Sequence, residues 1–315
     1  MKVLVTGGCG FIGSSFIKFL NNKGITNIDI CEPENNYQNK WKNLIDLRYN
    51  RILDPETVLE NVAYYSYDAV VHLGANSDTS QLPNKENWDN NINFSRQLIY
   101  QSQNALRKPI IVFASSGAVY GKETVDFSER LNVKPTNFYG FTKLDTEKRI
   151  QSLSINKNIY SLRFFNVYGG REMYKRNMSS PIFKWLNQEE KEITLFLSSN
   201  DNFKTSDMRR DFVYVYDVCE VIFHCLTSEV IGGTYNVGSG VATGWDIIAK
   251  EVFKAKNIDD GTICYALMPE KYIDHYQYYT CADLFRLRNE LGYQKSFTSI
   301  KDGVRLTLEE MINLY

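Results

Sequence analysis

A glycine-rich turn near the N-terminus most constrains what this chain can fold into. It reads Thr6-Gly7-Gly8-Cys9-Gly10-Phe11-Ile12-Gly13, and it separates a β-branched run at 2–6 from apolar residues at helical spacing over 11–22. A glycine turn that follows a strand and opens a helix is typical of a dinucleotide-binding βαβ unit. Gly7 and Gly10 let the backbone approach a pyrophosphate, Gly13 permits close helix–strand packing, and the helix N-terminus faces the phosphates. The turn therefore predicts cofactor binding.

The first half of the chain alternates short apolar runs with longer helical patterns. We expect strands at 2–6, 27–31, 69–73, 109–114 and 158–164, and helices at 11–22, 88–105 and 139–152. Apolar runs that alternate with helices indicate parallel strands joined by crossovers, so the predicted fold is α/β with a doubly wound parallel sheet.

After Asn166 the alternation of strand and helix patterns becomes less regular, and a smaller C-terminal α/β substrate-binding lobe is expected. Polar stretches at 187–192 and 198–210 predict loops around a short strand at 193–197, and helices are expected at 216–226, 245–253 and 299–312. We place a dinucleotide-binding domain at 1–166, with returning segments at about 210–235, and assign 167–315 mostly to the substrate lobe.

The composition limits the classes of partner and ligand that this protein is expected to bind. The 315 residues carry a formal net charge of −1, which gives no electrostatic footprint for nucleic acid or a membrane surface. Six dispersed cysteines without Cys-x-x-Cys spacing favour reduced thiols over disulfides, and three histidines show no metal-ligand spacing. With neither a signal peptide nor a long apolar span, we expect a cytoplasmic protein without a metal site.

Tyr139 and Lys143 form the candidate chemical centre. They are four positions apart, so a helix places them on one face, and they follow Ser115 and Ser116 at the end of an apolar run. A phenol titrates at about 10 in water, too high for a base at neutral pH. The Lys143 ammonium, together with a cofactor cation, could lower that pKa.

An acidic residue ends the second expected strand. Glu32 stands where a carboxylate accepts from the adenosine ribose hydroxyls, which favours NAD over NADP, although a solvated loop acid remains the alternative. Lys40 and Lys42 follow closely and could meet a 2′-phosphate. The cofactor is thus NAD or NADP, with NAD slightly favoured.

Several motifs together resemble the extended short-chain dehydrogenase/reductases that modify nucleotide sugars. Besides the glycine turn, Ser115-Ser116 and Tyr139-x-x-x-Lys143, they are Arg163-Phe164-Phe165-Asn166-Val167-Tyr168-Gly169 and Arg210-Asp211-Phe212-Val213. Within that family the likeness is narrowest to ADP-glycero-manno-heptose 6-epimerases. It is carried by Arg171-Glu172-Met173-Tyr174-Lys175, Asn202-Phe203-Lys204, Tyr276-Gln277 and Ala282-Asp283.

The resemblance implies a Rossmann domain, a cofactor retained through turnover and a set of residue roles. Tyr139 would be the acid/base, Lys143 would hold the nicotinamide ribose, Ser116 would bond the reacting oxygen, and Lys175 would be a second acid/base. The implied cofactor residues are Gly7, Gly10, Phe11, Ile12, Gly13, Glu32, Lys40, Leu73, Ala75, Ser77, Asn91, Tyr139 and Lys143. The implied substrate residues are Ser77, Ser116, Asn166, Val167, Asn177, Lys184, Arg210 and Tyr276.

For several of these residues a purely structural role stays open. Lys175 could be a solvated loop lysine, Asn91 and Asn166 could satisfy backbone groups, and Tyr276 could pack among neighbouring tyrosines. Relatives associate through paired helices, so a homo-oligomer is also expected by analogy.

The sequence also departs from the resembled family. Pro33 follows Glu32 where a side-chain donor is expected, Asn177 and Lys184 replace small and imidazole side chains, and 205–209 is an insertion. The leading hypothesis is an NAD(P)-dependent epimerase that acts through a keto intermediate, on an NDP-glycero-manno-heptose. The alternatives are a dehydrogenase that oxidises a GDP-heptose or related NDP-sugar, for instance at C4, and a non-catalytic dinucleotide-binding protein. A 4,6-dehydratase is disfavoured because Gly117 and Ala118, not an acidic pair, follow Ser116.

Overall fold

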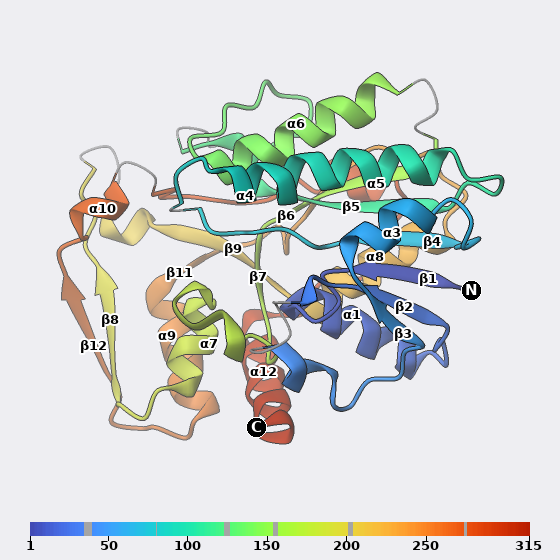
Figure 1. The fold of residues 1–315 in the computed structure, drawn as a ribbon. Coiled ribbons are helices and arrows are strands. Elements are labelled where there is room, and N and C mark those ends of the chain that lie inside the picture. Colours follow the sequence, from blue (N-terminus) through green and yellow to red (C-terminus); the bar gives the residue numbers. More distant parts are fainter. Residues whose placement is uncertain (35–39, 80, 123–126, 154–156, 201–203, 274–275) are drawn as a thin grey trace.

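Seven parallel strands form the main sheet of the computed structural model, which describes residues 1–34, 40–79, 81–122, 127–153, 157–200, 204–273 and 276–315 (Figure 1). Their order is β10-β6-β5-β4-β1-β2-β3, and every pairing is parallel. The strands are β1 (Val3–Thr6), β2 (Ile28–Cys31), β3 (Arg51–Leu53), β4 (Ala69–His72), β5 (Ile110–Ser116), β6 (Ile159–Phe164) and β10 (Thr234–Val237).

Helices cover both faces of this sheet. On one face α3 (Pro55–Asn61), α5 (Phe94–Gln103) and α6 (Phe138–Ser152) pack with Leu4 and Val70 of the strands. On the other face α1 (Phe11–Asn22) packs against α8 (Val215–Thr227). Strands buried on both faces have near-continuous apolar runs, which is why the sequence pattern was informative. The predicted doubly wound α/β fold is confirmed.

Two smaller sheets extend from the carboxyl side of the main sheet. In the order β11-β9-β7, β9 (Arg209–Tyr214) runs parallel to β7 (Asn166–Tyr168) and antiparallel to β11 (Ala242–Gly244). A parallel pair, β8 (Glu192–Phe196) and β12 (Thr262–Ala266), lies at the far edge in Figure 1. The accompanying helices are α7 (Pro181–Asn187), α9 (Trp245–Ala255), α10 (Glu270–Ile273), α11 (Phe285–Asn289) and α12 (Ile300–Leu314).

The structure differs from the sequence-based expectations mainly at short elements. The strands β3, β7, β9, β10, β11 and β12 were not predicted, and the expected loop at 198–210 ends inside β9. The helix expected at 88–105 is three segments: α4 (Lys85–Trp88), a π-helical turn η3 (Asp89–Asn93) and α5. Four short 3₁₀ helices also occur in the described residues: η2 (Trp41–Leu44), η4 (Gly117–Tyr120), η5 (Met173–Met178) and η6 (Thr205–Asp207). The division into domains at residue 166 stays a prediction.

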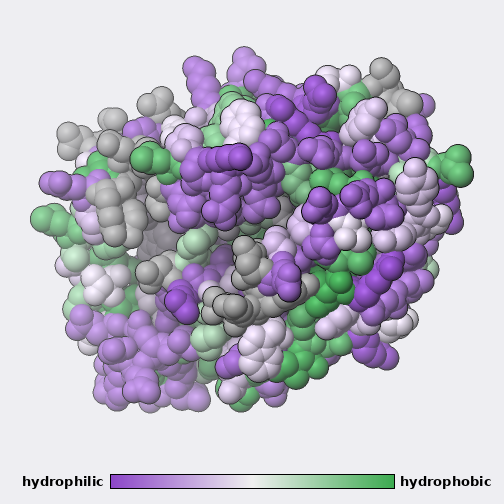
Figure 2. Space-filling model, in the orientation of Figure 1, coloured by the Kyte–Doolittle hydropathy of each residue, from purple (hydrophilic) through white to green (hydrophobic). Residues whose placement is uncertain are grey.

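The face shown in Figure 2 carries many hydrophilic side chains, with smaller apolar groups between them. Within the described ranges no helix has the length and apolar character that a membrane crossing requires. All six cysteines are free, and four of them are buried.

Candidate cofactor and catalytic site

A pocket opens at the carboxyl ends of the parallel strands. Its walls come from the glycine turn, from residues that follow β2 and β4, from the end of β5, from α6 and from the segment after β7. In open α/β sheets, ligands bind at this edge, where the strand order reverses. Here the order reverses between β1 and β4.

The glycine turn leaves room for an anion because its glycines have no side chains, and the backbone around Gly7 and Gly13 is too close for a Cβ. Gly7 has a φ of +67°, and a Cβ there would lie 2.7 Å from backbone atoms of Gly74. A Cβ at Gly13 would collide with the Gly7 carbonyl oxygen. The N-cap, Gly10, offers no side-chain cap, and among the described residues nothing accepts from the N–H groups of Ile12 and Gly13. The turn thus fits the pyrophosphate of a dinucleotide.

Glu32 lines this pocket beside the glycine turn and is 2% exposed. Its carboxylate accepts from Lys40 Nζ at 2.8 Å and from the backbone N–H of Cys9 at 3.3 Å. These bonds hold the carboxylate against the glycine turn, where ribose hydroxyls could donate to it. They also engage the Lys40 ammonium that a 2′-phosphate would need.

At the other end of the pocket Ser116, Tyr139 and Lys143 converge from β5 and α6. The Lys143 Nζ lies 5.6 Å from the centre of the Tyr139 ring. In the protein alone, burial raises the pKa of Tyr139 to about 12, while its hydrogen bond with Ser116 acts in the lowering direction. Burial also lowers the pKa of Lys143 to about 7, against the opposing effect of Glu147. The protein alone therefore keeps the phenol protonated, and a further positive charge is needed to stabilise its anion.

A carboxylate that sequence reasoning missed holds this helix in place. Glu147 is one turn beyond Lys143 on α6 and accepts from the Ser115 hydroxyl at 2.5 Å. It also forms a two-point ion pair with Arg163 of β6, at 3.0 and 2.7 Å. The spacing 139, 143, 147 on one helix face is the signal that could have found it.

The segment after β4 forms another wall of the pocket. Leu73, Ala75 and Ser77 line it, and Asn90 reaches it from the π-helical turn η3. Asn91 lies behind this wall and bonds both backbone groups of Asn76, at 2.8 and 2.9 Å. It therefore supports the segment, as the backbone-satisfying alternative for Asn91 anticipated.

Lys175 reaches the pocket from a different wall, the segment after β7. Its Nζ lies 3.8 Å from Glu172 and 5.4 Å from the centre of the Phe11 ring. Glu172 is fully buried and accepts from the Gly169 and Ser180 backbone N–H groups. The next residue, Arg176, has a φ of +49°, a strained conformation for a residue with a Cβ.

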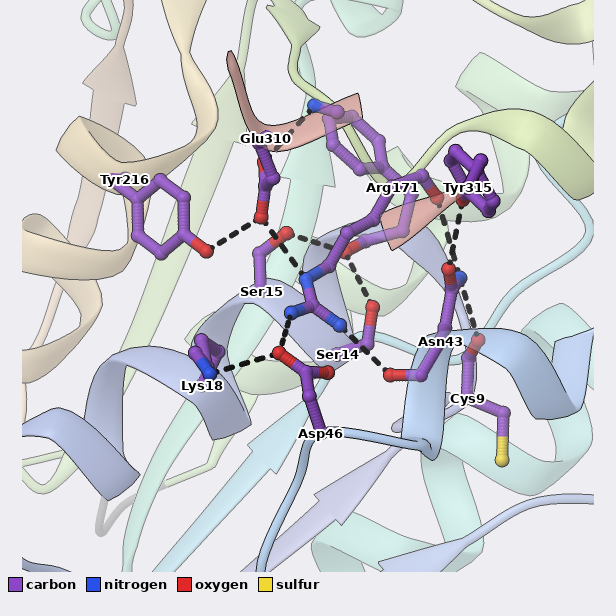
Figure 3. A network of polar contacts seen from close by, with 12 residues as sticks. Cys9, Ser14, Ser15, Lys18, Asn43, Asp46, Arg171, Tyr216, Glu310 and Tyr315 are labelled. Atoms are coloured by element: carbon purple, nitrogen blue, oxygen red, sulfur yellow. Dashed lines mark hydrogen bonds and ion pairs between the residues drawn. The ribbon is translucent and has the colours of Figure 1, made fainter. Parts of the chain in front are cut away.

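Arg171 anchors this segment to the rest of the protein (Figure 3). The guanidinium, 1% exposed, contacts Asp46 at 2.7 Å, Glu310 of α12 at 3.1 Å and the Asn43 carbonyl at 2.8 Å. Asn43 in turn donates to the Cys9 carbonyl at 3.2 Å. We call Arg171, Asn43, Asp46 and Glu310 the Arg171 clamp. It joins the Lys175 segment, the glycine turn and the C-terminal helix.

The substrate residues implied by the resemblance do not all line this pocket. Ser77, Ser116 and Val167 do. Asn166 is exposed at the start of β7 and accepts from Thr280, which also accepts from the Asp211 N–H of β9.

Arg210 and Tyr276 form a second group beyond the pocket. Arg210 is buried and its guanidinium carbon lies 4.8 Å from the centre of the Tyr276 ring. Gln277 links Arg210 to the Gly121 carbonyl. Lys184 is exposed on α7, and the side chain of Asn177 lies outside what the structure describes. The structure thus brings together the residues predicted to be catalytic and to bind the cofactor, with Asn91 as a support, and leaves the predicted substrate residues spread over separate places.

Comparison with known proteins places these features in a family. Residues 3–238 match the NAD dependent epimerase/dehydratase family. The chain is 35% identical to an ADP-L-glycero-D-manno-heptose-6-epimerase of Nitratidesulfovibrio vulgaris over 311 residues, which is 96% of this chain and 95% of the relative.

Solved structures agree. The ADP-L-glycero-D-manno-heptose-6-epimerase of Helicobacter pylori matches with a TM-score of 0.83 at 25% identity, over 99% of this chain and 96% of that one. The UDP-N-acetylglucosamine 4-epimerase of Methanobrevibacter ruminantium M1 has the same fold, with a TM-score of 0.83 at 22% identity over 100% and 99% of the two chains.

Proposed function

This chain belongs to the NAD dependent epimerase/dehydratase family, and from that premise we propose that it is a 6-epimerase of an NDP-glycero-manno-heptose. The observation that carries the proposal is that two proton-carrying side chains, Tyr139 and Lys175, reach one pocket from different walls. Inversion of a carbinol needs proton transfer on one face when the hydroxyl is oxidised and on another when the ketone is reduced again. The choice of a heptose as the substrate sugar is supported by the relative, which is named as a heptose 6-epimerase.

Cofactor binding is supported by the fit of the glycine turn and of Glu32. Gly7, Gly10 and Gly13 leave the first N–H groups of α1 to the pyrophosphate, and the Glu32 carboxylate would accept from the adenosine ribose. A solved neighbour with this fold, a UDP-glucuronic acid 4-epimerase of Bacillus cereus, was crystallised with NAD. When bound, NAD supplies the hydride acceptor and donor that carbinol oxidation and ketone reduction require.

The residues of this chain then handle the protons and the orientation. Ser116 bonds the reacting sugar oxygen, and Tyr139 takes its proton as the keto sugar forms. Lys143 would stabilise the tyrosinate that this transfer needs, together with the positive charge that the oxidised cofactor would supply. Once the keto sugar has turned its other face, Lys175 gives a proton to the oxygen from the wall after β7. The ion pair between Lys175 Nζ and Glu172 Oε2, at 3.8 Å, positions Lys175 for this transfer.

The test incubates the purified protein with ADP- and GDP-linked D-glycero-D-manno-heptose and follows C6 by proton NMR. The proposal expects a mixture of the two C6 epimers with no net redox change. Accumulation of a keto sugar together with reduced cofactor would instead identify a dehydrogenase. Turnover of the GDP sugar alone would identify GDP as the nucleotide and would still support epimerisation at C6.

A further inference from the structure

A tyrosine hydroxyl lies at the N-terminus of α1 and lines the pocket. The phenol oxygen of Tyr174 accepts a hydrogen bond from the backbone N–H of Phe11 at 2.9 Å. We propose that Tyr174 is a cofactor-binding residue, whose hydroxyl donates to a pyrophosphate oxygen while it accepts from Phe11. This inference rests on the proposed function, because it needs a dinucleotide in this pocket. It would make the segment that carries Lys175 part of the cofactor site.

The Tyr174 hydroxyl has a proton to give. A phenol can donate one hydrogen bond and accept others, and the contact with Phe11 uses only its accepting side. In the part of the chain that the structure describes, no acceptor takes the phenolic proton. Burial raises the pKa of Tyr174 well above its ordinary value, so the proton stays on the oxygen at neutral pH.

The surroundings of this hydroxyl suit an anion. A Cβ on Gly10 would lie 3.3 Å from the phenol oxygen, so Tyr174 closes the open side of the glycine turn. The N–H groups of Ile12 and Gly13 lie in the same first turn of α1, where the helix dipole also favours negative charge. The Lys40 ammonium is 5.5 Å from the centre of the Tyr174 ring. The Tyr174 hydroxyl is thus bordered by the N–H groups of Ile12 and Gly13 and by the positive end of the helix dipole, and both attract a phosphate.

The position of Tyr174 does not depend on its hydroxyl. Three residues before it, Arg171 is fixed by Asp46, Glu310 and the Asn43 carbonyl, and Asn43 also contacts the glycine turn (Figure 3). A Tyr174→Phe substitution therefore removes one hydroxyl and leaves the backbone of the segment held. Because Lys175 is the next residue, a bond from Tyr174 to the pyrophosphate would also fasten Lys175 when the cofactor is present.

The test titrates NAD and ADP-ribose, by calorimetry, into wild-type protein and Tyr174→Phe after removal of co-purified nucleotide. A hydrogen bond to a charged group is lost, so we expect the Kd for both ligands to rise about tenfold, equivalent to about 1.4 kcal/mol. ADP-ribose carries the pyrophosphate without the nicotinamide, so an equal loss assigns the contact to the pyrophosphate. Unchanged binding overturns the inference, as does a loss with NAD alone. Tighter binding also overturns it, because the phenol would then compete with the cofactor for Phe11.

Tyr160→Phe is the matched control. It removes another buried tyrosine hydroxyl. Tyr160 lies on β6, its hydroxyl donates to the Val230 carbonyl, and neither residue lines the pocket. Its Kd values should equal those of the wild type, and an equal loss in both variants would overturn the inference in favour of general loosening. Wild-type protein that binds neither ligand would overturn the proposed function itself, whereas normal wild-type binding with an unaffected Tyr174→Phe overturns this inference alone.

Discussion

The Lys143 Nζ lies 5.6 Å from the centre of the Tyr139 ring and 4.9 Å from the centre of the Phe113 ring. The ammonium is therefore held between the Tyr139 phenol and the ring of Phe113 on β5. Because Lys143 is 3% exposed, it has little contact with water. This burial shapes the acid–base properties of both residues more than their helical spacing does.

Stability should depend on pH through Lys143. Burial lowers the pKa of Lys143 from its ordinary value of 10.5 to about 7 in the folded protein. Between these values the unfolded chain binds more protons, so the free energy of unfolding rises with pH there and stops changing below about 7. Thermal unfolding of cofactor-free protein should show the wild-type midpoint rising with pH relative to that of Lys143→Met. Parallel curves for the two proteins would contradict the prediction.

Replacing Tyr139 by phenylalanine should remove epimerisation while keeping the fold. The substitution deletes the proton carrier, and such groups contribute roughly 10²–10⁴-fold to rate. We expect kcat to fall within or beyond that range, with NAD affinity close to that of the wild type. The measurement is the rate of C6 inversion by NMR, alongside a calorimetric Kd. A variant that kept a tenth of its activity or more would exclude Tyr139 as the acid/base.

Lys175→Met should separate the two halves of the reaction. Tyr139 can still take the first proton, so a single turnover should produce reduced cofactor and keto sugar, but the inverted epimer should not form. Rapid mixing with absorbance detection follows the first event, and NMR follows the second. Lys191→Met is the control, since Lys191 pairs with Asp260 on the surface at 2.9 Å. Normal inversion by Lys175→Met would return Lys175 to the role of a solvated loop lysine.

Glu32→Gln should shift cofactor preference toward NADP. The substitution removes the carboxylate that accepts from Lys40 at 2.8 Å, which releases the Lys40 ammonium for a 2′-phosphate. We expect NAD to bind about tenfold more weakly, because the ribose hydroxyls lose a charged acceptor. Calorimetry with both cofactors gives the ratio, with the exposed Glu34→Gln as control. A ratio unchanged by Glu32→Gln would show that Glu32 does not select the cofactor.

Breaking the Arg171 clamp should destabilise the protein. Arg171→Met leaves Asp46 and Glu310 without the guanidinium that lies 2.7 and 3.1 Å from them. Loss of one partner of a buried ion pair costs about 3–5 kcal/mol, whereas an exposed pair contributes about 0–1 kcal/mol. Urea unfolding should show the large loss for Arg171→Met and little change for Arg305→Met, whose pair with Glu309 is exposed. Equal effects in the two variants would refute a structural role for the clamp.

The parts of the fold that could be predicted are those whose signal is local. Strands β1, β2, β4, β5 and β6 are short apolar runs beside amphipathic helices, and the pattern located each of them. The missed strands had weaker local signals. β10 (Thr234–Val237) contains four residues and becomes a strand by pairing with β6, more than seventy positions earlier. β7 and β11 have three residues each and depend on β9 between them.

The candidate site divides in the same way. The turn at Gly7–Gly13 and the spacing of Tyr139 and Lys143 are determined by the sequence, because one backbone turn and one helix turn relate their members. Tyr174 and the Arg171 clamp were missed because their partners come from other elements, whereas Glu147 had a local signal in its spacing from Lys143. Phe11 and Tyr174 are separated by 163 positions, and Asn43 and Arg171 by 128.

By itself, then, the sequence determined the parallel sheet, the glycine turn and the position of Tyr139 and Lys143 on one helix face. Only the tertiary structure decided that burial raises the pKa of Tyr139, that Lys175 enters from a separate wall and that Tyr174 meets the helix that opens after the turn. The physical reason is that hydrogen-bond geometry within one turn follows from nearby residues. Desolvation and contacts between distant segments depend on how whole elements pack.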